Sequence, residues 1–189
     1  MPTEKNTDGF IPPHGGYRSL ITFQKAEIIY DGTVYFCNKN FGKYDRTKEQ
    51  MVQAARSGKQ NIAEASMASA TSKESEIKLT NVAKASLEEL MLDYEDFLRT
   101  KKSAKWERNG RLSKRFDELN RTPNANYDTF KKAIEHDDPA ISANFMICLV
   151  NVTIYLLKRQ IQTLEKDFLK EGGLRERMTR ARINARNKK

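Results

Sequence analysis

The sequence is poor in the residues that build disulfide frameworks, metal sites and tight turns. Its 189 residues include 2 cysteines, 2 histidines, 5 prolines and 9 glycines. Two cysteines cannot form a disulfide framework, and Cys37 and Cys148 lie in apolar surroundings where a reduced cysteine acts as a small hydrophobe. The low glycine and proline content excludes a collagenous chain and favours helices over turn-dense β structure. With so few ligand side chains, we expect no metal and no cofactor.

We expect neither a secretory signal nor a membrane span, although one apolar run is a borderline case. The first six residues, MPTEKN, lack an apolar region of the kind that signal peptides carry. Residues 140–157 contain 14 apolar residues in 18, but Asn144 and Asn151 interrupt them. Their length also falls short of the roughly 20 residues that a bilayer requires. We therefore expect a buried helix here, in a soluble cytoplasmic protein without membrane contact.

The apolar residues recur with a helical period, and no strand pattern is present, so the sequence predicts an all-α fold with four long helices. The first helix begins after Gly15-Gly16 and continues through Asp31-Gly32. The second follows a break at 41–45 and carries small residues that favour a close helix contact. The second helix has its buried stripe at Met51, Ala55, Gly58, Ile62 and Ala65.

The third helix is expected to begin at a capping box, with the Thr71 hydroxyl and the Glu74 carboxylate closing its first turn. Its stripe runs to about Arg99. The periodicity then fails over 101–139, where short helices are expected at 112–119 and 127–134. The fourth long helix follows Pro139 and ends near Lys170, before Gly172-Gly173. A final helix is expected from Leu174, with a thin stripe at Leu174, Met178, Ala181 and Ala185.

Positive charge is concentrated in two segments. The chain has 34 Lys and Arg against 25 Asp and Glu, a net charge of +9. Residues 99–115 carry a net +7 and residues 170–189 a net +6, which leaves −4 on the rest of the chain. The basicity therefore belongs to these two segments and not to the long helices.

Clustered arginine is typical of phosphate binding, because the guanidinium is a planar fork of donors that keeps its charge. The Trp106 and Phe116 rings are candidates for stacking on unpaired bases. The alternative is a solvated helix face and a disordered basic tail, since many soluble proteins carry such tails. The predicted nucleic-acid contacts are Arg175, Arg177, Arg180, Arg182, Arg186 and Lys188 in the C-terminal segment, with Lys102, Lys105, Trp106, Arg108 and Arg111 in the other.

Several stretches resemble one bacterial family. QMVQAARSGKQNIAEA at 50–65 and SKESEIKLTNVAKASLEEL at 72–90 closely resemble the four-helix bundle proteins encoded by intervening sequences of 23S ribosomal RNA genes. YRSLITFQKA at 17–26 resembles their opening helix. GGLRERMTRAR at 172–182 is similar to the ending of the subgroup named four helix bundle suffix domain proteins. The family differs at four places, with Trp at Phe23, Ile-Pro at Gly58-Lys59, and Gly at both Ala65 and Ala85.

The resemblance implies an up-and-down four-helix bundle over 17–171, with an N-terminal arm at 1–16, an insertion at 101–139 and a basic suffix at 172–189. Relatives include the accessory protein of diversity-generating retroelements, a basic pentameric barrel that binds nucleic acid and its reverse transcriptase. The resemblance thus implies a homo-oligomer, with a pentamer as its stoichiometry. It also implies a reverse transcriptase or other mobile-element protein as a partner.

Asn61 and Glu64 form a polar pair on a small, apolar helix face. We expect a structural role, in which they satisfy hydrogen bonds between helices, for example with Ser86, and fix the register of the helices.

No catalytic arrangement is evident. Ser57-Gly58-Lys59 lacks the upstream glycine of a phosphate loop, and Glu135-His136 lacks a second histidine four residues away. Asp93, Glu95 and Asp96 are expected on a solvated helix face. The sequence therefore predicts a non-catalytic, oligomeric nucleic-acid-binding protein, with RNA favoured over DNA. The alternative is a protein-interaction scaffold whose basic suffix docks on an acidic partner such as a reverse transcriptase.

Overall fold

The computed structural model describes residues 14–187, and no strand occurs within that range. The all-α prediction is confirmed. The elements are a 3-10 turn η1 at Tyr17–Ser19 and the helices α1 Ile21–Asn40, α2 Arg46–Ala68, α3 Lys73–Thr100, α4 Arg111–Asn120, α5 Tyr127–Ile134, α6 Pro139–Glu171 and α7 Leu174–Asn187.

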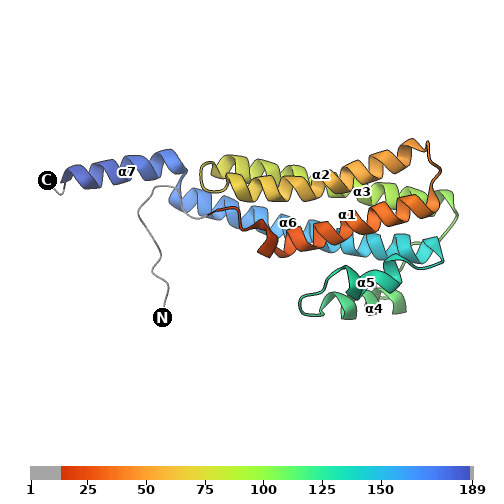
Figure 1. The fold of residues 1–189 in the computed structure, drawn as a ribbon. Coiled ribbons are helices and arrows are strands. Elements are labelled where there is room, and N and C mark those ends of the chain that lie inside the picture. Colours follow the sequence, from red (N-terminus) through yellow and green to blue (C-terminus); the bar gives the residue numbers. More distant parts are fainter. Residues whose placement is uncertain (1–13, 188–189) are drawn as a thin grey trace.

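Four of these helices, α1, α2, α3 and α6, lie side by side around one core (Figure 1). α2 packs against α1 and α3, and α6 packs against the same two helices. Short connections at 41–45 and 69–72 reverse the chain between neighbours. α4 and α5 lie against this group at one end, and α7 extends away from the other end (Figure 1).

α1 passes through Asp31-Gly32 without interruption, as the periodicity predicts. Gly32 is buried, and a Cβ on it would lie 3.0 Å from the Met146 side chain and 3.2 Å from Ile134. Because Gly32 has no side chain, α5 and α6 can both pack closely against α1 at this point. A turn is not formed there.

The small-residue stripe of α2 is buried as predicted. A Cβ on Gly58 would lie 2.8 Å from Cδ2 of Leu87, a fully buried side chain on α3. Gly58 thus sets how closely α2 and α3 pack, as the small side chains lead one to expect.

The capping residue of α3 is Ser72, so the expectation that Thr71 caps this helix is wrong. Ser72 Oγ accepts the Ser75 N–H at 3.1 Å, from an extended backbone with φ −145°. Thr71 belongs to the preceding turn, where its hydroxyl donates to the Ala68 carbonyl. Glu74 pairs with Lys78 at 2.6 Å on the exposed face. Thr71 is still part of the turn that follows α2, so Ser72 is the first residue with the extended backbone that an N-cap residue adopts.

The apolar stretch at 140–157 lies in the first half of α6 and contributes much of the core. A helix beginning at Pro139 is the one helix within 14–187 that is long and apolar enough to cross a bilayer, judged by length and composition. Of its most apolar window, 56% is buried inside the structure. Asn144, within this stretch, is only 2% exposed.

The predicted short helices within 101–139 are confirmed as α4 and α5. Their aromatic side chains join the core, because the Phe116 and Phe130 rings lie 5.2 and 5.6 Å from the Phe145 ring. Buried Lys25 of α1 donates to Asn120 Oδ1 at the end of α4. The segment is therefore packed onto α1 and α6 as part of the same core.

An aromatic cluster fills the core between α1 and α3. The Phe36 ring lies 5.0 Å from Tyr94 and 4.9 Å from Phe97. The Tyr94 hydroxyl donates to Thr33 Oγ1 at 3.0 Å. This buried phenol therefore has its hydrogen bond satisfied, as buried tyrosines usually do.

Candidate nucleic-acid interface

Two glycines set the junction between α6 and α7, where the sequence predicts a helix end. Gly172 has φ +70°, and a Cβ there would lie 3.1 Å from Glu176 Cβ. Its N–H donates to the Phe168 carbonyl at 2.9 Å, which closes α6. The Gly173 N–H donates to Glu176 Oε2 at 2.9 Å, so the first turn of α7 is capped by its own side chain. A residue other than glycine at 172 would strain this junction.

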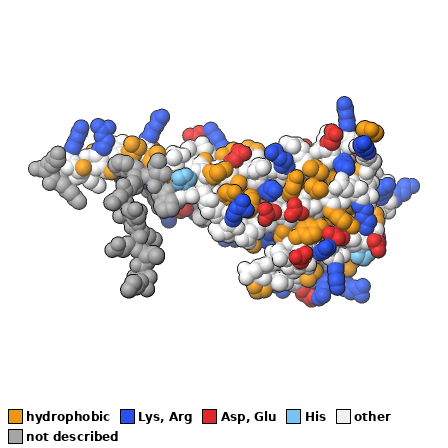
Figure 2. Space-filling model, viewed as in Figure 1, with side chains coloured by type: hydrophobic (Ala, Val, Ile, Leu, Met, Phe, Trp, Pro, Cys, Tyr) orange, Lys and Arg blue, Asp and Glu red, His pale blue; other side chains and the backbone are white. Residues whose placement is uncertain are grey.

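α7 projects from the body of the molecule and buries none of its residues (Figure 1). Its predicted apolar stripe is only partly covered, since Leu174 and Ala181 are half-buried whereas Met178 is 40% exposed. Arginine side chains stand along this helix (Figure 2). Arg175, Arg182 and Arg186 are exposed on one flank. Glu176, the only acidic residue in α7, already accepts a backbone hydrogen bond.

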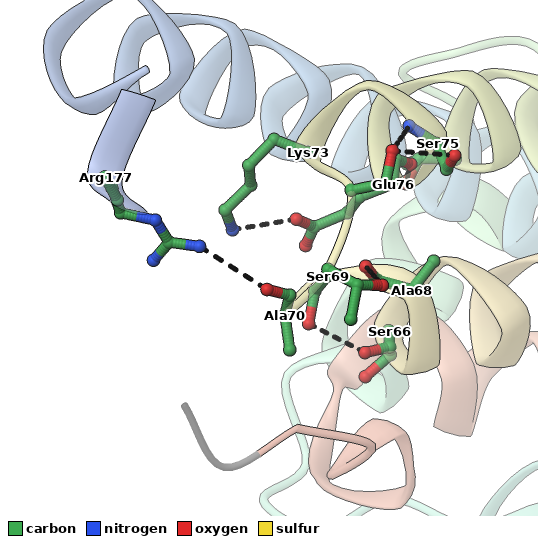
Figure 3. Close-up of polar contacts among 11 residues, drawn as sticks. Ser66, Ala68, Ser69, Ala70, Lys73, Ser75, Glu76 and Arg177 are labelled. Atoms are coloured by element: carbon green, nitrogen blue, oxygen red, sulfur yellow. Dashed lines mark hydrogen bonds and ion pairs between the residues drawn. The ribbon is translucent and has the colours of Figure 1, made fainter. Parts of the chain in front are cut away.

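Arg177 lies where α7 meets the turn between α2 and α3 (Figure 3). Its Nη2 donates to the Ala70 carbonyl at 3.4 Å, and its Nε is buried and has no partner among the described residues. Nearby, the Lys73 ammonium pairs with the largely buried Glu76 at 2.8 Å. Arg177 therefore anchors α7 to the body. Of the other predicted contacts, Arg180 lies on α7, and Lys188 is outside the described residues.

The other basic segment lies at the opposite end of the molecule from α7 (Figures 1 and 2). Its charges are partly neutralised, because Arg99 pairs with Asp96 at 2.9 Å and Lys105 pairs with Glu95. Arg115 likewise pairs with Glu118 at 2.9 Å. The predicted contacts Lys102, Arg108 and Arg111 are exposed there. One molecule does not bring the two basic segments together.

The two aromatic residues of that segment are held by the fold. Phe116 is 3% exposed and packs against Phe145, so the expectation that its ring stacks on bases is wrong. Its helix is amphipathic, and the ring occupies the core-facing side. Trp106 is partly buried against the core, and Asn144 Oδ1 accepts its backbone N–H at 2.7 Å.

Of the polar residues predicted to join α2 and α3, Asn61 and Ser86 are linked through Ser57, for which the sequence indicated no such role. Ser57 Oγ lies 2.9 Å from Ser86 Oγ, across the two helices. Asn61 Nδ2 donates to the carbonyl and to the hydroxyl of Ser57, at 2.9 and 3.2 Å. Asn61 therefore reaches Ser86 only through Ser57, because its side chain turns back along α2. Glu64 is exposed, so the expectation that it forms hydrogen bonds between the helices is wrong.

Two hollows lie beside these helices. A cleft of about 530 Å³ separates the turn between α1 and α2 from the end of α3, and Asp93 lines it. Burial raises the pKa of Asp93, and the neighbouring Glu89 and Asp96 raise it further. A groove of about 360 Å³ between α2 and α3 is lined by Glu49, Gln50, Gln53, Ala54, Ser57, Ser86 and Glu89. No group of three or more His, Cys, Asp and Glu side chains suited to a metal occurs within 14–187.

No protein-family model, curated protein or solved structure matches the chain. The resemblance to the intervening-sequence family therefore stays a prediction.

Proposed function

We propose that this protein is a non-catalytic, oligomeric nucleic-acid-binding protein that contacts phosphates through α7. The observation that carries the proposal is the exposure of Arg175, Arg182 and Arg186 on a helix that projects from the body. The single carboxylate of α7 is engaged with Gly173 and lies outside this flank. Guanidinium groups presented in this way suit phosphate oxygens, which accept paired N–H donors.

The proposal includes the finer architecture and the family. α1, α2, α3 and α6 would form an up-and-down four-helix bundle, with α4 and α5 as the insertion and α7 as the suffix. Their contacts in chain order and their short reversing connections support this arrangement. The resemblance favours RNA over DNA and a homo-oligomer with pentameric stoichiometry. The proposal also includes a cytoplasmic location, which we expect from the sequence pattern of the N-terminal residues.

A gel-shift titration at low salt tests the function with structured RNA, single-stranded RNA and duplex DNA. The key variant replaces Arg175, Arg177, Arg180, Arg182 and Arg186 with Gln. The matched control replaces Lys102, Lys105, Arg108, Arg111 and Lys114 with Gln, which removes the same formal charge from the opposite end. We expect the α7 variant to bind at least tenfold more weakly and the control to bind nearly as well as the wild type.

Two outcomes would contradict the proposal. If the wild-type protein binds none of the three probes, phosphate binding is not its function. If the control loses affinity and the α7 variant does not, the interface lies at the other end of the molecule. Circular dichroism should show nearly unchanged helix content in both variants.

The second candidate function is a protein-interaction scaffold whose suffix docks on an acidic protein, such as a reverse transcriptase. The exposed Met178 side chain favours it, because an apolar stripe gains free energy on a protein surface and little on phosphates. Recovery of one specific protein in a pull-down after nuclease treatment would support this candidate.

A further inference from the structure

The groove between α2 and α3 has a floor of small side chains and an acidic rim. Of the lining residues, Ala54 is buried and Ser57 and Ser86 are half-buried, so they form the floor. Glu49 and Glu89 are exposed, as are Gln50 and Gln53. Both glutamates are exposed, and neither forms an ion pair with any residue in the range 14–187. A groove of this kind suits a third helix that carries small residues and positive charge.

α7 has the complementary features. Its stripe of Leu174, Met178, Ala181 and Ala185 is narrow and ends in small residues. Arg175, Arg182 and Arg186 border the stripe on one side. No described acidic side chain pairs with these three arginines. A helix of 14 residues is marginally stable in water by itself, so packing of its apolar stripe would stabilise it.

The groove that α7 would enter belongs to another molecule. Arg177 fixes the start of α7 at Ala70, in the turn between α2 and α3. From that point α2 runs back toward the opposite end of the body, and α7 points away from it (Figure 1). At 1.5 Å per residue, Ser57 lies about 20 Å back along α2 from Ala70. A second copy can place its groove on α7 while Arg177 stays hydrogen-bonded to Ala70.

We propose that α7 of one molecule docks in the groove between α2 and α3 of a second copy. The Ala181 side of the stripe packs on the small floor, and the arginine flank pairs with Glu49 and Glu89. Each copy presents both a helix and a groove, so the contact is head-to-tail and repeats into a closed ring or an open filament. The inference rests on the oligomeric state in the proposed function, and does not depend on nucleic-acid binding.

The same arginines serve both contacts, so phosphate and groove compete for α7. A nucleic acid that occupies Arg175, Arg182 and Arg186 leaves the groove of the next copy empty. We therefore expect a short single-stranded oligonucleotide to shift the protein toward smaller assemblies.

Sedimentation velocity of the full chain at low salt, over a range of concentrations, tests the interface. The groove variant carries Glu49→Gln and Glu89→Gln. The control carries Glu107→Gln, before α4, and Asp128→Asn, in the first turn of α5. Both residues are exposed, and the two substitutions remove the same charge as those in the groove. We expect the groove variant to need at least tenfold higher concentration for half-maximal association, and the control to associate like the wild type. Equal association of wild type and groove variant would overturn the inference.

Thiol cross-linking identifies the occupant of the groove. Copies with Gln53→Cys are mixed with copies that carry Ala181→Cys, and a short thiol-specific cross-linker is added. We expect a cross-linked dimer at least tenfold more abundant than in a control mixture where Asn151→Cys, exposed on α6, replaces the groove cysteine. No excess over the control would overturn the inference. A double variant with Gln53→Cys and Ala181→Cys in the same chain tests the alternative. A cross-link within single molecules of this variant would overturn the inference, because it would show that α7 folds back on its own groove.

Gel-shift binding by the groove variant separates the two proposals. Its arginines are intact, so we expect an affinity equal to or higher than that of the wild type. If the cross-link fails to form but the protein binds nucleic acid, only the docking interface is overturned. If the wild-type protein binds no nucleic acid, the proposed function is overturned.

Discussion

The side-chain amide of Asn144 in α6 forms hydrogen bonds to the backbone of the segment before α4 through both its oxygen and its nitrogen. Its Oδ1 bonds to Trp106. That oxygen accepts the Trp106 N–H at 2.7 Å, while Nδ2 donates to the Ala104 carbonyl at 3.0 Å. The amide lies 2% exposed within the most apolar stretch of the chain. It therefore gives the docked segment polar partners inside the core.

Replacing Asn144 with Ala should destabilise the protein. The change leaves the partly buried Trp106 N–H without its acceptor, at a cost of about 1–3 kcal/mol for a buried polar group. Urea unfolding measures the loss. Asn151→Ala, on the exposed face of the same helix, is the control, and we expect it to stay within about 0.5 kcal/mol of wild type. Equal stability of the two variants would show that the amide contributes nothing to docking.

Gly58→Ala should also destabilise the protein, although alanine is the better helix former. The new Cβ would meet Leu87 Cδ2 at 2.8 Å in a packed interface, and overpacking costs about 1–3 kcal/mol. The gain in helix propensity is about 1 kcal/mol, so we expect a net loss of up to about 2 kcal/mol. Denaturant melts should compare it with Gly42→Ala, where the Cβ would meet nothing within 4 Å. A more stable Gly58→Ala variant would mean that α2 and α3 can separate at little cost.

The free energy of unfolding should fall in alkaline solution. Burial raises the pKa of the Cys37 thiol from 9.0 to about 12 and that of Cys148 to about 11. Burial likewise raises the pKa of Tyr94. Above pH 9 the unfolded chain releases the Cys37 proton that the folded chain keeps, so stability declines as pH rises toward 12. Burial of Lys25 lowers its pKa and acts in the opposite direction below 10.5.

The Cys37→Ala variant isolates this effect. Between pH 9 and about 12 its stability should fall less steeply than that of the wild type, by about 1.4 kcal/mol per pH unit. Unfolding curves in urea with a reductant present measure both slopes. Parallel slopes would show that the thiol titrates alike in the folded and unfolded chains.

Single arginine variants should show whether an exposed arginine of α7 contributes more to the salt dependence of binding than an arginine that is already in an ion pair. Arg182→Gln removes one exposed cation of α7, so the slope of log affinity against log salt should become shallower by about 0.9 for duplex DNA or 0.7 for a single strand. Arg115→Gln is the control, because Glu118 already pairs with that guanidinium at 2.9 Å. The measurement is a fluorescence-anisotropy titration over several salt concentrations. A larger change for Arg115 than for Arg182 would place the phosphate contacts on α4.

Local patterns predicted the helices well, because each depends on neighbours in the sequence. The stripe of α2, the short helices α4 and α5, and the glycine end of α6 all follow from periodicity and backbone preference. The cap of α3 shifted by one residue because Thr71 and Ser72 are chemically equivalent candidates, and only the path of the chain out of the turn selects Ser72.

Contacts between distant residues could not be predicted in the same way. Phe116 looked available for bases because it lies beside many cations, but Phe145 covers its ring from 29 residues away in the sequence. The relay through Ser57 depends on how α2 and α3 are rotated against each other. Whether the two basic segments share a surface depends on the lengths and directions of α3 and α6, which place them at opposite ends.

The length of α7 limits the footprint of each molecule on a nucleic acid. Its 14 residues span about 21 Å, and successive phosphates of one strand advance by about 3.4 Å along the axis of a duplex. One arm therefore covers at most about six consecutive nucleotides, too few to specify a long site unaided. Because phosphates and the groove compete for the same arginines, a longer target would be covered by several molecules side by side, each with its α7 released from the groove of its neighbour.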